Sequence, residues 1–244
     1  MLGIDVELGV PVFGVPVPGK NVAHLIVYSG SKLAVNIAET AQTTEASVRI
    51  SYPALEPTVI EVVEKVLTRF VNYIYDVAEA PFKVLVEAYV KGNATPLMIL
   101  SSVSAVVVTY LEKLWGEPLT LDEVLLACRA LDEELEVCRS LSNAYRAFTL
   151  KRAPLVYREG EGAIILETPP HELKVSFRYL RGASVAYDLE SNPLADHLTY
   201  LISRIPVEAA LNIACGERLR RLFMTEAFIQ RCILRASTHS IGSK

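Results

Sequence analysis

Three serines stand close together in front of an apolar segment, at Ser101, Ser102 and Ser104. If a helix begins beside them, its free backbone amides and the positive end of its dipole could hold a phosphate group. Serine hydroxyls could add hydrogen bonds to that phosphate. Met98–Leu100 precede them without a glycine, and such side chains resist the close approach and positive φ of a phosphate loop. The alternative is structural, with Ser101 or Ser102 as the N-cap of the helix.

The cysteines and histidines form no metal-ligand pattern. No pair of cysteines makes a C-x-x-C motif, and the histidines are scattered along the chain. We interpret the cysteines as buried free thiols in a reducing compartment. Cys128 and Cys138 are expected on one helix but on different faces. No zinc site is therefore expected.

Composition limits the classes of protein that this chain can belong to. It has 244 residues, 51% hydrophobic and 21% charged, with a net charge of −4, as expected of a globular protein that does not coat nucleic acid. Mean hydropathy is +0.31, but the most apolar stretch, Leu97–Leu111, is shorter than the roughly 20 residues of a membrane span. We interpret that stretch as a buried helix. Met1–Glu7 lacks a basic region, so we expect no secretory signal, no membrane partner and a cytoplasmic location.

Apolar periodicity predicts the elements that would position these residues. The expected strands are Val10–Val17, His24–Tyr28, Lys32–Ile37, Ala46–Ile50, Phe82–Val90, Leu173–Tyr179 and a hairpin of Leu155–Tyr157 with Ala163–Glu167. The expected helices are residues 58–77, 102–114, 120–145, 193–204 and 206–236, with a turn at Gly30-Ser31 and a loop over 92–100. Thr58–Glu61 and Thr120–Glu123 each read as a capping box. This order of elements is typical of an α+β protein in two lobes.

The middle of the chain resembles the GHMP kinase superfamily. In those kinases a strand leads to a Pro-x-x-x-Gly-Leu-Gly-Ser-Ser-Ala-like loop, a buried helix, Gly-x-Pro-Leu-Ser/Thr and an acidic helix. Here Pro96–Ala105 reads PLMILSSVSA, and Gly116–Thr120 reads GEPLT. Ala153–Gly160 resembles the hairpin of the family, and Leu173–Phe177 resembles the first strand of its second lobe. The nearest likeness is to archaeal pantoate kinases, through Val17-Pro-Gly19 and Ser29–Ala34.

The resemblance implies a fold, an activity and a set of site residues. The fold is two-lobed α+β, with an N-terminal lobe over residues 1–167 like domain 2 of ribosomal protein S5. A shortened ferredoxin-like C-terminal lobe would cover residues 168–244. The implied activity is ATP-dependent phosphoryl transfer to a substrate hydroxyl, with pantoate, in coenzyme A biosynthesis, as the candidate substrate. ATP would bind at Ser101, Ser102 and Ser104, and magnesium at Ser102 and Glu134.

Two further positions take implied roles. Asn143 stands where the family has a catalytic aspartate that orients or deprotonates the substrate hydroxyl, and an asparagine cannot accept that proton. Lys20 would contact a phosphate or carboxylate of the substrate. The roles of Glu134 and Lys20 each have a structural alternative. Glu134 also fits a solvated helix face, and Lys20 also fits a turn.

The end of the chain departs from the family, and the departures leave three hypotheses open. Ser240–Lys244 resembles the approach to a glycine-rich turn that does not follow, either because the subfamily lost the closing strands or because the chain is truncated. The first hypothesis is an active small-molecule kinase. The second is a non-catalytic binding or regulatory subunit of the same fold, whose high hydrophobicity suits a homo-oligomer. The third is an unrelated α+β protein.

Overall fold

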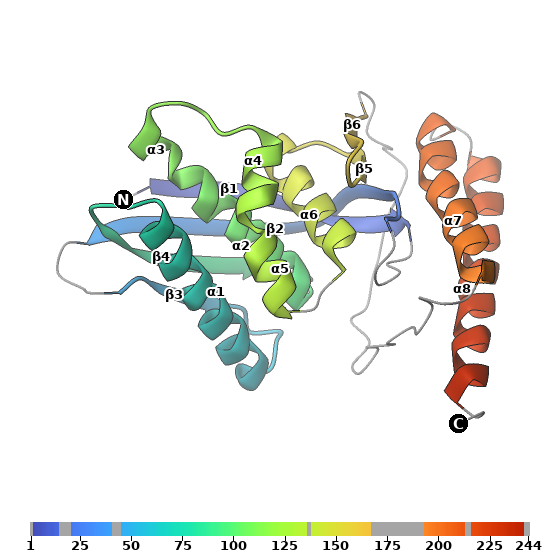
Figure 1. The fold of residues 1–244 in the computed structure, drawn as a ribbon, viewed down its shortest axis with the longest axis horizontal. Coiled ribbons are helices and arrows are strands. Elements are labelled where there is room, and N and C mark those ends of the chain that lie inside the picture. The colour runs from blue at the N-terminus through green and yellow to red at the C-terminus, as the bar shows by residue number, and fades with distance from the viewer. Residues whose placement is uncertain are drawn as a thin grey trace.

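The long strand β2 (His24–Thr40) organises the sheet of this α+β protein (Figure 1). The computed structural model describes residues 2–14, 21–40, 45–135, 138–166, 193–212 and 216–241. Along one edge β2 pairs with β1 (Leu2–Phe13). Along its other edge it pairs with β4 (Lys83–Lys91) and, at its N-terminal end, with β5 (Leu155–Arg158). The hairpin partner β6 (Gly162–Ile165) and the parallel strand β3 (Ser47–Ser51) complete six strands.

Side chains of helix α1 (Pro57–Val77) cover the outer edge of β3. The amides of residues 46, 48 and 50, which have no strand partner on that side, donate to Asn72 Oδ1 at 2.8 Å, Thr68 Oγ1 at 3.1 Å and Glu64 Oε1 at 2.6 Å. The four-residue spacing of these acceptors places them on one face of α1. The sheet edge is therefore closed to pairing with another chain.

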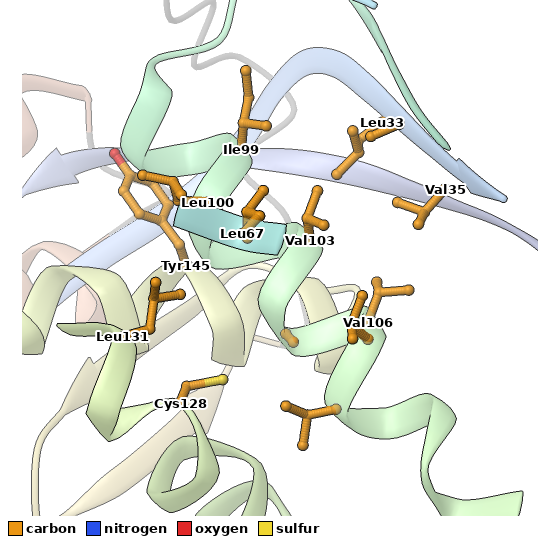
Figure 2. Packing of buried hydrophobic residues seen from close by; sticks show 14 of the residues in the cluster. Leu33, Val35, Leu67, Ile99, Leu100, Val103, Val106, Cys128, Leu131 and Tyr145 are labelled. Atoms are coloured by element: carbon orange, nitrogen blue, oxygen red, sulfur yellow. The ribbon is translucent and has the colours of Figure 1, made fainter. Parts of the chain in front are cut away.

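One face of the sheet carries the main core, with helix α2 (Pro96–Tyr110) at its centre (Figure 1). Figure 2 shows α2 packed through Ile99, Val103 and Val106 near β2, α1 and the following helices. The stretch Pro96–Trp115 is long and apolar enough to cross a membrane, with a mean hydropathy of 1.6 in its most apolar part. However, 72% of that part is buried inside the protein. It is a core helix, as the sequence predicts.

Four short helices follow α2 on the same face of the sheet. They are α3 (Glu112–Trp115), α4 (Leu121–Ala127), α5 (Arg129–Leu135) and α6 (Arg139–Lys151). Thr120 caps α4, and its amide bonds Glu123 in return, so the second predicted capping box is confirmed. Gly116, with a φ of 71°, ends α3 in the left-handed conformation that favours glycine.

The opposite face of the sheet carries a second, smaller core near β5. Helices α7 (Pro193–Leu211) and α8 (Gly216–Ile241) lie side by side there (Figure 1). The second core joins apolar side chains of the sheet, such as Leu25 and Val27, to Ile202 and Ile205 of α7. Ile26, between those two sheet residues, faces the main core instead, as strand alternation requires.

The structure corrects several predicted boundaries. Gly30-Ser31 is a bulge inside one continuous β2 rather than a turn, and residues 96–100 are the first part of α2 rather than a loop. The N-cap of α1 is Glu56, so Thr58–Glu61 is not its capping box. The helix predicted over 120–145 is three helices, which places Cys128 and Cys138 at the ends of different ones. Pro206 lies inside α7 and does not begin a helix.

Other predictions are confirmed or lie outside the described part. The helix over 58–77, the strand over 82–90 and the hairpin around Gly160 all form. The strand predicted at Leu173–Tyr179 and the lobe boundary at 167–168 fall in residues that the structure does not describe. Lys20 does as well.

Candidate functional site

The turn before α2, where a phosphate loop is predicted, uses its amides internally. The amide of Asn93 donates to Ser31 Oγ at 2.8 Å, and that of Ala94 donates to the Tyr52 hydroxyl at 2.9 Å. Thr95 caps the helix by accepting from the amide of Met98 at 3.2 Å. Its carbonyl accepts from the amide of Ile99, also at 3.2 Å.

The remaining groups of this turn leave little for a ligand. The amide of Thr95 points to the sulfur of Met98 at 3.4 Å, and Pro96 has no amide proton. Gly92 has a φ of +98°, and a Cβ there would lie 2.6 Å from Ser31 Oγ. Its missing side chain is therefore explained by close packing on Ser31. Of the amides from residue 93 to residue 99, that of Leu97 alone is left without a described partner.

The three serines lie one turn further along α2, inside the core. Ser102 Oγ is 2.9 Å from Thr149 Oγ1 of α6. Ser104 Oγ donates to the carbonyl of Ser101 at 2.9 Å and accepts from Arg146 Nε at 3.2 Å. Ser101 Oγ is buried without a hydrogen-bond partner. None of the three is more than 2% exposed, and none is the N-cap of α2, which is Thr95.

A fully buried ion pair lies beside these serines. Arg146 of α6 binds Asp132 of α5 through two parallel bonds, Nη1 to Oδ2 at 2.6 Å and Nη2 to Oδ1 at 2.7 Å. Both side chains are at most 3% exposed. Nη1 also donates to Asn143 Oδ1 at 2.9 Å, and Nε donates to Ser104, so each of the three guanidinium nitrogens has a hydrogen-bond partner. We call Asp132, Arg146, Asn143, Ser104, Ser102 and Thr149 the interior polar cluster.

The structure brings some of the predicted site residues together and separates others. Asn143 and Ser104 meet through Arg146, and Asn143 is only 4% exposed. Glu134 instead points to the surface, where its carboxylate pairs with Arg69 of α1. The acid that faces the interior is its neighbour Asp132, so the serines and Glu134 do not share a site in this structure.

A second constellation joins four segments at the end of the sheet near α8. Glu226 Oε1 accepts from the amide of Gly14 at 2.8 Å. The carbonyl of Gly14 accepts from His24 Nδ1 at 3.0 Å, and His24 Nε2 lies 3.0 Å from Ser140 Oγ. Because a carbonyl can only accept, Nδ1 carries the proton and the Ser140 hydroxyl donates to Nε2. Cys138 Sγ then lies 3.3 Å from Ser140 Oγ.

Burial dominates the electrostatics of this constellation. It lowers the pKa of His24 to about 4, against the raising effect of the bond to Gly14. It raises the pKa of Glu226 to about 7, against the lowering effect of the Gly14 amide. The second carboxylate oxygen of Glu226 is buried without a partner. Glu226 thus holds α8 to the end of β1 through one bond whose strength depends on its charge.

Most of these residues were missed by sequence reasoning. Asp132 had a signal in the sequence, because it lies four residues after Cys128, on the apolar side of the helix predicted over 120–145. The sequence carried no such signal for His24 or Glu226, because their partners are more than a hundred residues away or are backbone groups. Among the described residues no group of three metal-ligating side chains is present. A shallow hollow of about 380 Å³, lined mainly by polar residues of β3 and β4 with Glu64, lies apart from both clusters.

Comparison with solved structures shows which fold this is. A mevalonate kinase structure is 13% identical, with a TM-score of 0.63 over 96% of this chain and 80% of that one. L. major mevalonate kinase in complex with R-mevalonate is 12% identical, with a TM-score of 0.66 over 96% and 76%. Streptococcus pneumoniae phosphomevalonate kinase in complex with phosphomevalonate and AMPPNP is 10% identical, with a TM-score of 0.59 over 96% and 80%.

No family model and no curated protein matches the sequence. The likeness to these solved structures shows that the chain has the fold of the GHMP kinases. Identities of 10–13% establish the fold alone. The predicted fold class is confirmed, and the likeness to pantoate kinases stays a prediction.

The interior ion pair predicts strongly non-additive mutational effects. Arg146→Met leaves Asp132 buried and unpaired, so we expect the free energy of unfolding to fall by about 3–5 kcal/mol. Adding Asp132→Leu removes the stranded charge, and the double variant should recover a large part of that loss. Urea unfolding of the two single variants and the double variant measures the coupling. Strictly additive losses would contradict the pairing.

Glu226 and His24 predict opposing pH dependences. Glu226 keeps its proton in the folded protein between pH 4.5 and about 7, so its contribution to stability is full below pH 4.5 and is lost as pH rises. His24 is neutral when folded, so its contribution is lost as pH falls from 6.5 towards 4. Each is on the order of 3 kcal/mol, and the two slopes oppose between pH 4.5 and 6.5.

The variant Glu226→Gln separates the two slopes, because glutamine can still accept from the Gly14 amide but does not titrate. Its stability should rise with pH from 4.5 to 6.5, as His24 alone requires. Its stability relative to the wild type should also increase from pH 5 to pH 8. Chemical denaturation across that range measures both, and parallel curves for the two proteins would show that Glu226 is not buried as described.

Proposed function

We propose that this chain is a non-catalytic protein of the GHMP kinase fold, acting as a binding or regulatory subunit. The observation that carries the proposal is the turn from Gly92 to Pro96, whose amides are committed to partners within the protein. Phosphate binding at a helix N-terminus depends on amides that are free to donate. In this protein those amides already donate to other groups of the folded chain.

The neighbouring side chains support the same conclusion. Met98 and Ile99 are buried, at 1% and 0% exposed, in the first turn of α2. Ser102 and Ser104 are buried and form hydrogen bonds with Thr149 and Arg146 of α6. Turning Ser104 toward a nucleotide would leave Arg146 Nε without its partner, and turning Ser102 would remove one of the two hydrogen bonds of Thr149 Oγ1. An unpaired buried polar group costs about 1–3 kcal/mol.

Asn143, at the position where the family resemblance implies a catalytic residue, also has a hydrogen-bond partner inside the protein. The amide oxygen of Asn143 accepts from Arg146 Nη1 at 2.9 Å. The group that could take a proton from a hydroxyl is therefore absent, and its replacement serves the interior polar cluster. Phosphoryl transfer depends on positioning and charge stabilisation, and these residues supply neither to a substrate.

A second candidate is an active small-molecule kinase that uses ATP and magnesium. It is favoured by the fold, which this chain shares with a phosphomevalonate kinase solved with its substrate and AMPPNP. In that case the nucleotide would reach Ser101, Ser102 and Ser104 only after α2 loses its first turn. Pantoate is the candidate substrate that the sequence suggests, with Lys20 and Glu134 as candidate contacts to substrate and metal.

Binding of Mg-ATP separates the two candidates. A nucleotide that binds the folded protein raises its stability by about 2.7 kcal/mol at a hundred times its dissociation constant. We expect no change in melting temperature at millimolar Mg-ATP and no heat of binding by calorimetry. A saturable upward shift would support the kinase instead.

The matched variants are Ser102→Ala and Thr149→Ala, which remove either side of one hydrogen bond. We expect Ser102→Ala to lower stability by about 1 kcal/mol and Thr149→Ala by more, because Thr149 also donates to the carbonyl of Tyr145 and buries a methyl group. Neither variant should change the response to nucleotide. If Mg-ATP stabilises the wild type and Thr149→Ala but not Ser102→Ala, the proposal is wrong.

A further inference from the structure

Glu226 lies on the apolar side of helix α8, among residues that pack into the second core. Leu219 and Leu222 precede it by seven and four residues, and Ile229 follows it by three. These spacings place all four side chains on one side of the helix. The three apolar side chains belong to the second core or pack against it, and Glu226 itself is only 5% exposed. A carboxyl group therefore stands where this helix otherwise buries apolar residues.

Only one oxygen of this carboxyl group has a hydrogen-bond partner. Oε1 accepts from the amide of Gly14 at 2.8 Å, and Oε2 is buried without a partner. A neutral, protonated carboxyl group is the form that such a position accepts, because a buried charge needs several donors or an ion-pair partner.

No charged group among the described residues compensates for an ionised Glu226. β1 carries no charged residue after Glu7. On β2, His24 donates its Nδ1 proton to the carbonyl of Gly14, and burial keeps the imidazole neutral by lowering its pKa to about 4. The next group beyond His24 is the hydroxyl of Ser140 on α6.

The remaining charged groups around the second core lie at the surface. Most of them form pairs there, Arg204 with Glu208 on α7, Arg221 with Glu217 on α8, Arg139 of α6 with Glu159, and Arg158 with Glu161 in the hairpin of β5 and β6. Arg218 and Arg220 of α8 are exposed. The pKa of Glu226 consequently depends on burial, which raises it to about 7, and on the Gly14 amide, which lowers it.

Two neighbouring contacts join α8 to the end of β1. The ring of Phe223 meets the buried ring of Phe13 edge-on, with centroids 5.9 Å apart, but Phe223 is itself 56% exposed. The bond from Gly14 to Glu226 is the other contact. Among the described residues no second hydrogen bond links α8 to the sheet, so the state of one carboxyl group has a large effect on this attachment.

We propose that Glu226 is a pH-dependent switch that keeps α8 packed against the end of β1 while it carries a proton and releases the helix when it loses that proton. An ionised carboxylate has one donor in the packed position and full hydration in the released one. Release would withdraw Leu219 and Ile229 from the second core and leave the main core intact. The inference does not depend on whether the protein binds nucleotide.

The sign follows from the direction of the pKa shift. Glu226 has a higher pKa when α8 is packed than when its carboxyl group is in water, so packing is strongest below pH 4.5 and weakens as pH rises through about 7. The change therefore falls near neutral pH.

Hydrogen exchange of the full chain at pH 6 and pH 8 tests the proposal, with each rate expressed as protection relative to an unfolded chain at the same pH. Between pH 6 and pH 8, protection of residues 219–229 should fall roughly tenfold further in the wild type than in Glu226→Gln, which does not titrate. Comparison with this variant cancels the contribution of His24. Amides of residues 99–104 in α2 should show no such difference between the two proteins.

The matched control is Glu217→Gln, which removes a carboxyl group from the exposed side of the same helix and should keep the pH dependence of the wild type. Equal pH dependence of α8 protection in the wild type and Glu226→Gln would overturn the proposal, because Glu226 would then not control the helix. A loss of protection in α2 that matches the loss in α8 would also overturn it, because the whole fold would then open rather than one helix.

Discussion

The buried pair of Arg146 and Asp132 sets the arrangement of the helices around it. Removing two charges from water is costly unless their hydrogen-bonding groups are satisfied, and here the interior itself must supply the partners. Asp132 supplies two bonds, Asn143 a third and Ser104 a fourth. These partners come from α5, α6 and α2, so the pair fixes how the three helices meet. Ser104 consequently faces α6, and Ser102, two residues earlier, meets Thr149 of the same helix.

The start of α2 follows the same requirement. Ala94 is buried, so its amide must be paired, and the Tyr52 hydroxyl does so. Thr95 caps the helix by accepting from the amide of Met98. The turn before α2 is tied to β2 through Ser31 and to the segment after β3 through Tyr52. The proposed loss of phosphoryl transfer rests on this closed turn.

Elements with a strong local pattern could be predicted from the sequence, and those decided by distant partners could not. The apolar periodicity of 58–77 and the alternation of 82–90 predict α1 and β4 well. The sequence predicts the start of α2 too late, because the three serines resemble a helix N-terminus, whereas Thr95 and Pro96 provide it. The interior contacts of Ser102 and Ser104 could not be predicted, because their partners Thr149 and Arg146 are more than forty residues away in the sequence. The roles of His24 and Glu226 depend on the backbone of Gly14, which leaves no trace in residue type.

Hydrogen exchange of the amides of residues 99–104, with and without Mg-ATP, tests the central claim most directly. These amides are helical and lie under α6, so the closed turn predicts slow exchange in the free protein and no change when nucleotide is added. Fast exchange in the free protein that becomes slow with Mg-ATP would show a loop that orders around phosphate, and would contradict the account.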